Sequence, residues 1–286
     1  MSPVLVERLA KEPELLQLGG EMKKMTILFA DIRGFTKISE TYKEHPQELT
    51  EFVNKFLTPM TKVILDRHGT IDKYMGDCVM AFWNAPLPDM AHPSNACSSA
   101  LAMLRACEEV GVIVKQQAEQ RAEAARQTIL SLQGTPHTTQ DNENMELALA
   151  KKSLALAEQE KLLDVAIGIG LNTDVVCVGN MGSDQRFDYS IVGDGVNLAA
   201  RLEGQSKTYG IPIIIGENTY EDINDFALIE LDLIQVKGQT RPTRIYGVLG
   251  EKDDAVSEDF LHYSTQHKNF QFLAFLCFGI FLIHFW

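Results

Sequence analysis

The chain is organised around residues 27–36, Ile-Leu-Phe-Ala-Asp-Ile-Arg-Gly-Phe-Thr. The apolar run from Met25 to Ala30 is typical of a short central strand. Asp31 stands where this strand should end, and Gly34 indicates a turn just beyond it. A carboxylate there suits Mg²⁺, which prefers oxygen ligands and usually needs only one or two from the protein. Taken alone, such an aspartate is more often a turn or cap residue.

A second carboxylate follows in the stretch from Ile71 to Phe82. Two short strand-like runs flank Met75-Gly76-Asp77, a pattern that predicts a β-hairpin with Asp77 in its turn. The chain therefore offers two aspartates, each at the end of a predicted strand.

Three motifs occur in a fixed order: FADIRGFT (29–36), KYMGD (73–77) and VGDGVNLAAR (192–201). Together they resemble the class III nucleotidyl cyclase catalytic domain in its bacterial-type adenylate cyclase form. The resemblance covers roughly Met25 to Gly250. Palms with two carboxylates also occur in polymerases and in diguanylate cyclases, but the Gly-Gly-Asp/Glu-Glu-Phe loop of the latter is absent from this sequence.

The fold that this resemblance implies is α+β and palm-like, with the ferredoxin-like order βααββαβ. A mixed or antiparallel sheet should carry helices on one face. Helical periodicity over 35–66, with a new helix starting at Pro46, fits this order. The expected strands are 25–30, 70–75, 78–82, 164–171, 175–179, 211–215, 228–234 and 244–248.

The predicted organisation has three parts. Residues 1–22 form an N-terminal helical linker that stops at Gly19-Gly20, residues 23–250 form the catalytic domain, and residues 251–286 form an acidic and then hydrophobic tail. Residues 107–162 are rich in Ala, Gln, Glu, Lys and Leu and predict an inserted antiparallel helical hairpin. Both a solvated extension and a regulatory or partner-binding arm remain open for it.

Charge and cysteine content limit which classes of binding partner and which cellular compartment are expected. The formal charge of −13 argues against a nucleic-acid polymer as partner. Five scattered cysteines without metal-ligand spacing predict reduced thiols in a cytoplasmic protein. The apolar stretch 272–286 spans roughly 22 Å as a helix, short of a ~30 Å bilayer core. Membrane docking, packing on the domain and an aberrant chain end all remain open for it.

The family resemblance implies where metals and phosphates would bind. Asp31, Asp77 and the carbonyl of Ile32 would hold two ions of Mg²⁺ or Mn²⁺. Asn197 and Arg201, which share one helix face at i, i+4 spacing, would hold the ribose and stabilise charge on the α-phosphate.

The resemblance also implies how the base and the triphosphate are bound. Lys73 would face the purine, because a donor suits the N1 acceptor of adenine whereas guanine needs a carboxylate. Its partner position is Ser190, where the family usually has aspartate or threonine. Arg186 and Lys237 would reach the triphosphate.

The function implied is adenylate cyclase: conversion of ATP to 3′,5′-cyclic AMP and pyrophosphate, for intracellular signalling. The family builds each site across a dimer, so a two-fold homodimer is expected. Two rivals stay open, a guanylate or mixed-specificity cyclase and a catalytically silent signalling module. An upstream sensor or membrane region outside this chain would supply the signal.

Overall fold

The computed structural model describes residues 19–133, 140–183, 185–235 and 242–253. Its strands are β1 (Gly19–Ile32), β2 (Thr70–Met75), β3 (Cys78–Trp83), β4 (Ile167–Ser183), β5 (Arg186–Val192), β6 (Ile213–Gly216), β7 (Phe226–Ile234) and β8 (Thr243–Glu251). Its helices are α2 (Phe35–Thr41), α3 (Pro46–Leu65), α4 (His92–Gln133), α5 (Gln140–Glu160), α6 (Asp194–Tyr209) and α7 (Glu217–Glu221).

The described strands form one mixed sheet in the order β2-β3-β1-β4-β6-β8-β7, with β5 paired to β4. Apart from α5, the elements from β1 to β4 follow the predicted βααββαβ order, and β2-β3-β1-β4 are antiparallel neighbours. The parallel pairing of β4 with β6 makes the sheet mixed. The α+β fold class is therefore confirmed.

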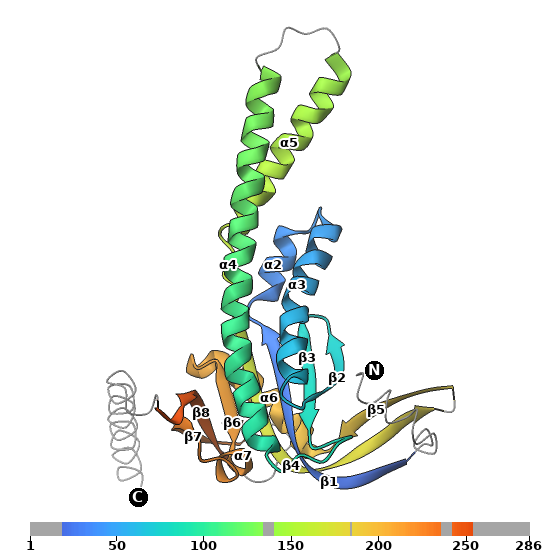
Figure 1. Cartoon of the computed structure of the whole chain (residues 1–286), viewed down its shortest axis with the longest axis vertical. Coiled ribbons are helices and arrows are strands. Elements are labelled where there is room, and N and C mark those ends of the chain that lie inside the picture. The colour runs from blue at the N-terminus through green and yellow to red at the C-terminus, as the bar shows by residue number, and fades with distance from the viewer. Residues whose placement is uncertain (1–18, 134–139, 184, 236–241, 254–286) are drawn as a thin grey trace, which may run out of the picture.

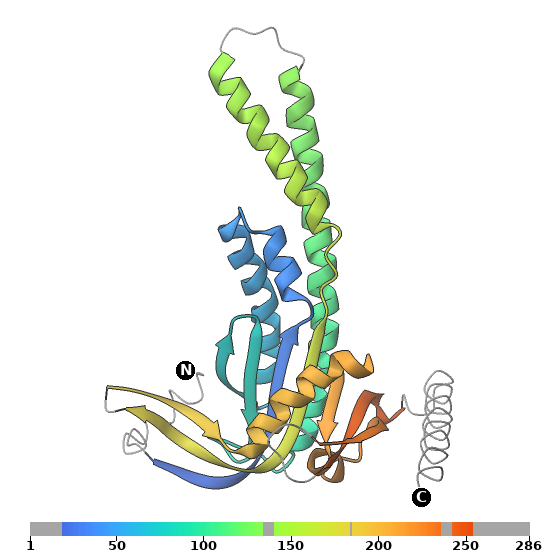
Figure 2. The ribbon, with the colours of Figure 1, turned by 180° about the vertical axis from the view of Figure 1, so that it is seen from behind.

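The helices cover both faces of the sheet, so the prediction of helices on one face was wrong. On β1, Leu28 and Ile32 belong to the core shared with α3 and α4. Ile27 and Phe29 point the other way and pack in a second core with Val196 of α6. Because neighbouring strand residues alternate between faces, an unbroken apolar run is what a strand buried on both sides requires. Figures 1 and 2 show α3 and α4 on one side and α6 on the other.

Strand β4 is continuous, whereas two strands, 164–171 and 175–179, were predicted. It pairs with β1 from Ile167, opposite Ile32, to Asn180, opposite Gly19. The polar residue Thr173 does not form a turn but lies buried in the strand, where its hydroxyl is 2.8 Å from that of Thr26. The long pairing also places Gly19 and Gly20 in β1 instead of in a linker.

Helices α4 and α5 form an antiparallel helical hairpin that projects from the domain (Figure 1). The first arm is not a separate helix inserted at residue 107. Instead, α4 begins at His92, packs against the sheet through residues such as Met103, and continues without a break to Gln133. The hairpin therefore extends an element of the catalytic core.

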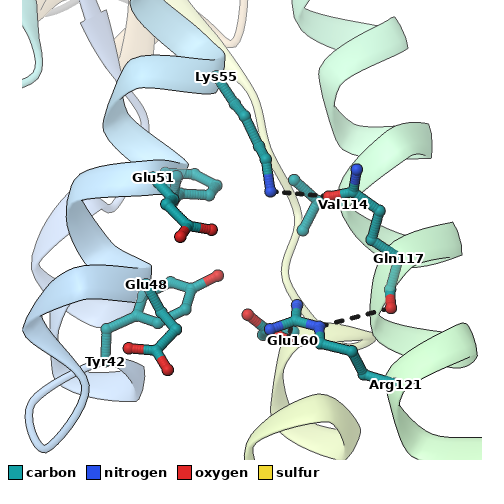
Figure 3. Close-up of a pocket in the computed structure, with 9 residues that line it drawn as sticks. Tyr42, Glu48, Glu51, Lys55, Val114, Gln117, Arg121 and Glu160 are labelled. Atoms are coloured by element: carbon teal, nitrogen blue, oxygen red, sulfur yellow. Dashed lines mark hydrogen bonds and ion pairs between the residues drawn. The ribbon is translucent and has the colours of Figure 1, made fainter. Parts of the chain in front are cut away.

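The base of this hairpin is attached to α2 and α3 through polar contacts (Figure 3). Glu160, the last residue of α5, is buried and forms an ion pair with Arg121 of α4. Burial raises the pKa of Tyr42, just beyond α2, and the charge of Glu160 and a hydrogen bond to it add to the rise. Lys55 of α3 donates to Gln117 of α4 at 2.7 Å.

Several predictions fall outside the described residues, among them the N-terminal helix before residue 19 and the apolar tail 272–286. Across the described ranges, no helix combines the length and apolar character needed to cross a membrane. Cys78, Cys97, Cys107 and Cys177 form no disulfide in the described part of the chain, and Cys277 lies outside it.

Candidate active site

Two aspartates meet where β1 ends. Asp31 is the penultimate residue of β1, and Asp77 lies in the turn that joins β2 to β3. Because Ala30 of β1 pairs with Val79 of β3, the turn is held beside the end of β1. Burial raises the pKa of Asp31 to about 7, and a hydrogen bond and charge repulsion from Asp77 contribute to the rise.

This pair has the chemistry of a divalent cation site. The two carboxylates repel each other, and Oδ2 of Asp77 is buried without a hydrogen-bond partner among the described residues. A hard cation between them would offset both costs. The described residues contain no group of three or more His, Cys, Asp and Glu side chains that could hold a metal. Mg²⁺ does not need one, because it keeps several of its waters.

A third carboxylate, Glu203 of α6, lies close to this pair and was missed by the sequence analysis. Burial raises its pKa, the charge of Arg33 lowers it, and the charge of Asp77 raises it. Glycines in β4 let α6 approach this closely, since a Cβ on Gly170 would lie 2.1 Å from the backbone nitrogen of Glu203. Glycines inside a strand signal such an approach, and Gly168 and Gly170 carried that signal in the sequence.

Lys73 and Ser190 are brought together by a buried carboxylate, Asp72. The Ser190 hydroxyl donates to Oδ2 of Asp72 at 2.6 Å, and Nζ of Lys73 lies 3.1 Å from Oδ1 of Asp72. The side chain of Asp72 is 1% exposed, whereas that of Lys73 is 46% exposed. The structure thus places the two predicted base-contacting residues, from β2 and β5, on one carboxylate.

Asp72 was also missed, because a residue next to Lys73 in a regular strand points to the opposite face. Strand β2 is irregular here: Ile71 pairs with Ala81 and Lys73 with Met80, so Asp72 is an extra residue. Such a bulge changes the direction of side chains locally. It allows neighbouring residues to share a salt bridge.

Among the described residues, no hydrogen bond or ion pair joins the remaining predicted residues to the aspartates. Asn197 is exposed and Arg201 is half-buried on α6, and neither side chain forms a hydrogen bond or ion pair with another described residue. Arg186 lies at the tip of the β4–β5 hairpin opposite Ser183, whereas Asp31 pairs at the other end of β4. Lys237 lies outside the described residues.

Known proteins of similar sequence and structure carry cyclase names. An adenylate cyclase of Anabaena cylindrica is 30% identical over 230 residues, covering 79% of this chain and 37% of that protein. The crystal structure of the adenylyl cyclase CyaB from P. aeruginosa superimposes with a TM-score of 0.59 at 31% identity, covering 83% of this chain and 99% of that one. The guanylyl cyclase Cya2 matches with a TM-score of 0.58 at 28% identity, covering 82% and 96%.

The chain spans only about a third of the length of the curated relatives it matches, 37% of one and 28% of another. The family model described as the adenylate and guanylate cyclase catalytic domain matches residues 20–250. Since this match takes in most of the chain and all three sequence motifs, the protein belongs to that family, the class III nucleotidyl cyclases.

Proposed function

We propose that this protein is an adenylate cyclase that converts ATP to 3′,5′-cyclic AMP and pyrophosphate at a homodimer interface. The observation that carries the proposal is the pair of carboxylates formed by Asp31 and Asp77, which contact each other. One oxygen of this pair, Oδ2 of Asp77, is buried without a hydrogen-bond partner among the described residues. A two-metal phosphoryl-transfer site needs such a pair.

Asp31, Asp77 and the carbonyl of Ile32 would hold the two ions. When bound, Mg²⁺ or Mn²⁺ would lower the pKa of the ribose 3′-hydroxyl and neutralise charge on the triphosphate. Asn197 would orient the ribose so that the 3′ oxygen lies in line with the α-phosphorus. As the new bond forms and the bond to the bridging oxygen breaks, the guanidinium fork of Arg201 would bind the charge that develops on the α-phosphate.

The choice of ATP rests on Lys73. Its ammonium group is a donor only, which suits N1 of adenine and opposes the N1–H of guanine. Ser190 adds a hydroxyl that can accept from the adenine amino group. A guanylate cyclase is the second candidate function, because the structural relatives include one by name and Ser190 departs from the usual residue.

The test is a turnover assay with ATP and GTP, each with Mg²⁺ and with Mn²⁺. We expect cyclic AMP from ATP, and an Asp31→Asn variant that retains its fold but loses at least about 100-fold in kcat. The matched control is Asp66→Asn, which removes an exposed ion pair with Lys62 at the end of α3 and should leave the rate unchanged.

Three results would contradict the proposal. Absence of cyclic nucleotide from ATP with either ion excludes the reaction. A preference for GTP supports the guanylate cyclase. Nucleotide binding without turnover supports a silent signalling module.

The wider setting is part of the same proposal. Because this chain covers about a third of its curated relatives, an upstream sensor or membrane region would supply the signal. Arg186 lies at the opposite end of β4 from Asp31, so it would contact the triphosphate in the partner's site. Lys237 would join it there, in a cytoplasmic homodimer.

A further inference from the structure

We infer that Asp72 is a positioning residue that fixes the hydrogen-bond polarity of Ser190 and the direction of Lys73, and thereby enforces the choice of ATP over GTP. The inference rests on the proposed function, since it concerns the purine end of the same site. Asp72 itself would not touch the nucleotide.

The first step is geometric. The Asp72 side chain is buried, and its Oδ2 accepts from the Ser190 hydroxyl at 2.6 Å. Its Oδ1 has no hydrogen-bond partner among the described residues but lies 3.1 Å from the Lys73 ammonium, within ion-pair distance. The bulge in β2 makes this arrangement possible, because it lets Asp72 and Lys73 turn towards each other although they are adjacent in sequence. The carboxylate therefore joins β2 to β5 within one subunit.

The second step concerns the hydroxyl proton. A serine hydroxyl has one donor and two acceptor lone pairs, and its proton can normally rotate to suit either partner. A carboxylate accepts only, so the contact with Asp72 commits the Ser190 proton to that carboxylate. The lone pairs that remain can accept from the 6-amino group of adenine but offer no donor to the 6-oxo group of guanine.

The third step concerns Lys73. The ammonium group has three donors, and it forms an ion pair with Asp72 without a hydrogen bond to Oδ1. This ion pair restricts the flexible side chain while leaving its donors for N1 of adenine. In guanine this position is itself a donor, so the same orientation is repulsive. One buried carboxylate therefore sets both recognition groups to read adenine.

The experiment compares kcat/KM for ATP and for GTP in the wild type, Asp72→Asn, Ser190→Ala and the double variant. An asparagine can donate to Ser190 and so releases the hydroxyl proton. We expect the ATP-to-GTP ratio to fall about 10-fold or more in Asp72→Asn, the effect of one lost discriminating contact. We expect Ser190→Ala to lower it similarly, and the double variant to add little, because both changes remove the same interaction.

The control is Asp232→Asn on β7, which disturbs another hydroxyl–carboxylate contact, that with Tyr209 at 2.7 Å. It should leave the ratio unchanged, and Ser190→Thr, which keeps a hydroxyl, should retain it. If Asp72→Asn unfolds, the two Ser190 variants still test the inference. Ser190→Ala must lower the ATP-to-GTP ratio of kcat/KM, and Ser190→Thr must leave it unchanged. An unchanged ratio in Asp72→Asn, or additive effects in the double variant, would overturn the inference.

A binding assay separates this inference from the proposed function. Displacement of a fluorescent ATP analogue by ATP and by GTP gives the ratio of the two affinities without turnover. Suppose that the wild type prefers ATP, that Asp72→Asn removes this preference, and that no product forms. The inference then stands and the proposed function fails. If product forms but the ratio does not move, the proposed function stands and the inference fails. If the wild type binds neither nucleotide, both fail.

Discussion

At the scale of single residues, His92 shows how a buried titratable group makes stability depend on pH. Its Nδ1 lies 2.7 Å from the hydroxyl of Thr26, which in turn lies 2.8 Å from that of Thr173. Burial lowers the pKa of His92 below its ordinary value of 6.5. The charged groups that act on it are two carboxylates, which raise its pKa, and two lysines, which lower it: Asp89, Asp222, Lys24 and Lys23.

The sign of the effect follows from where the proton binds. Below pH 6.5 the unfolded chain takes up a proton at His92 that the folded protein still excludes, so the free energy of unfolding should fall as the pH falls through this range. We predict that His92→Gln removes part of this fall in urea titrations between pH 7.5 and 5.5. The pKa of Asp31 is raised to about 7, so this group increases the free energy of unfolding as the pH falls. The effect of His92 must therefore be measured as the difference between the wild type and His92→Gln.

The control for this prediction is His45→Gln, which alters a half-exposed histidine 3.7 Å from Glu48 and should keep the wild-type pH dependence. If His92→Gln and the wild type lose stability in parallel as the pH falls, burial of His92 has no influence on this dependence.

At the scale of elements, the contact between β4 and α6 depends on Gly170. A Cβ at this position would lie 2.1 Å from the nitrogen of Glu203 and 2.3 Å from the carbonyl oxygen of Ala199. These are backbone atoms, so the whole helix would have to move. We predict that Gly170→Ala lowers the free energy of unfolding by about 1–3 kcal/mol, the usual cost of overpacking. Urea denaturation measures this change.

The matched control is Gly204→Ala on α6. Nothing lies within 4 Å of a Cβ built on Gly204. Alanine is the better helix former, so this substitution should stabilise the protein by about 0.5–1 kcal/mol. If Gly170→Ala leaves the free energy of unfolding unchanged or raises it, the close approach of α6 does not govern this position.

The elements also show which features the sequence could predict. The β2–β3 hairpin was predicted almost to the residue, because apolar alternation and the Gly76-Asp77 turn are local signals. The break predicted within 167–183 is absent, because Thr173 is held by Thr26 and Thr219, which are distant in sequence. The covering of the second sheet face by α6 was not predicted. Gly168 and Gly170 make room for that helix, and this can be recognised only when the position of α6 is known.

The candidate site follows the same rule. Asp31 and Asp77 were found from strand ends and a turn, and Lys73 and Ser190 from motif positions. Asp72 was not found, because its role depends on a bulge that moves one side chain to a neighbour's face. A bulge of this kind depends on pairing between strands and produces no periodic pattern in a single sequence.

At the scale of the whole molecule, the groups proposed for catalysis and for phosphate binding lie on different elements. Ala199 and Leu202 are the buried side of α6, whereas Asn197 is exposed and Arg201 half-buried. Asp31 lies at one end of β4 and Arg186 at the other. If the chain is an adenylate cyclase, two subunits related by a two-fold axis would have to bring these groups together.

We predict that Asp31→Ala and Arg201→Ala proteins are each inactive and regain activity when they exchange subunits. A heterodimer places both lesions in one site and leaves the other intact, so an equal mixture should reach about one quarter of wild-type activity, because half of the dimers carry one working site of two. The control mixes Asp31→Ala with Asp77→Ala, whose lesions lie in the same half, and should stay inactive. Cyclic AMP formation after exchange, with heterodimers counted through two affinity tags, is the measurement. If heterodimers of Asp31→Ala and Arg201→Ala form and remain inactive, each subunit must complete its site from its own residues.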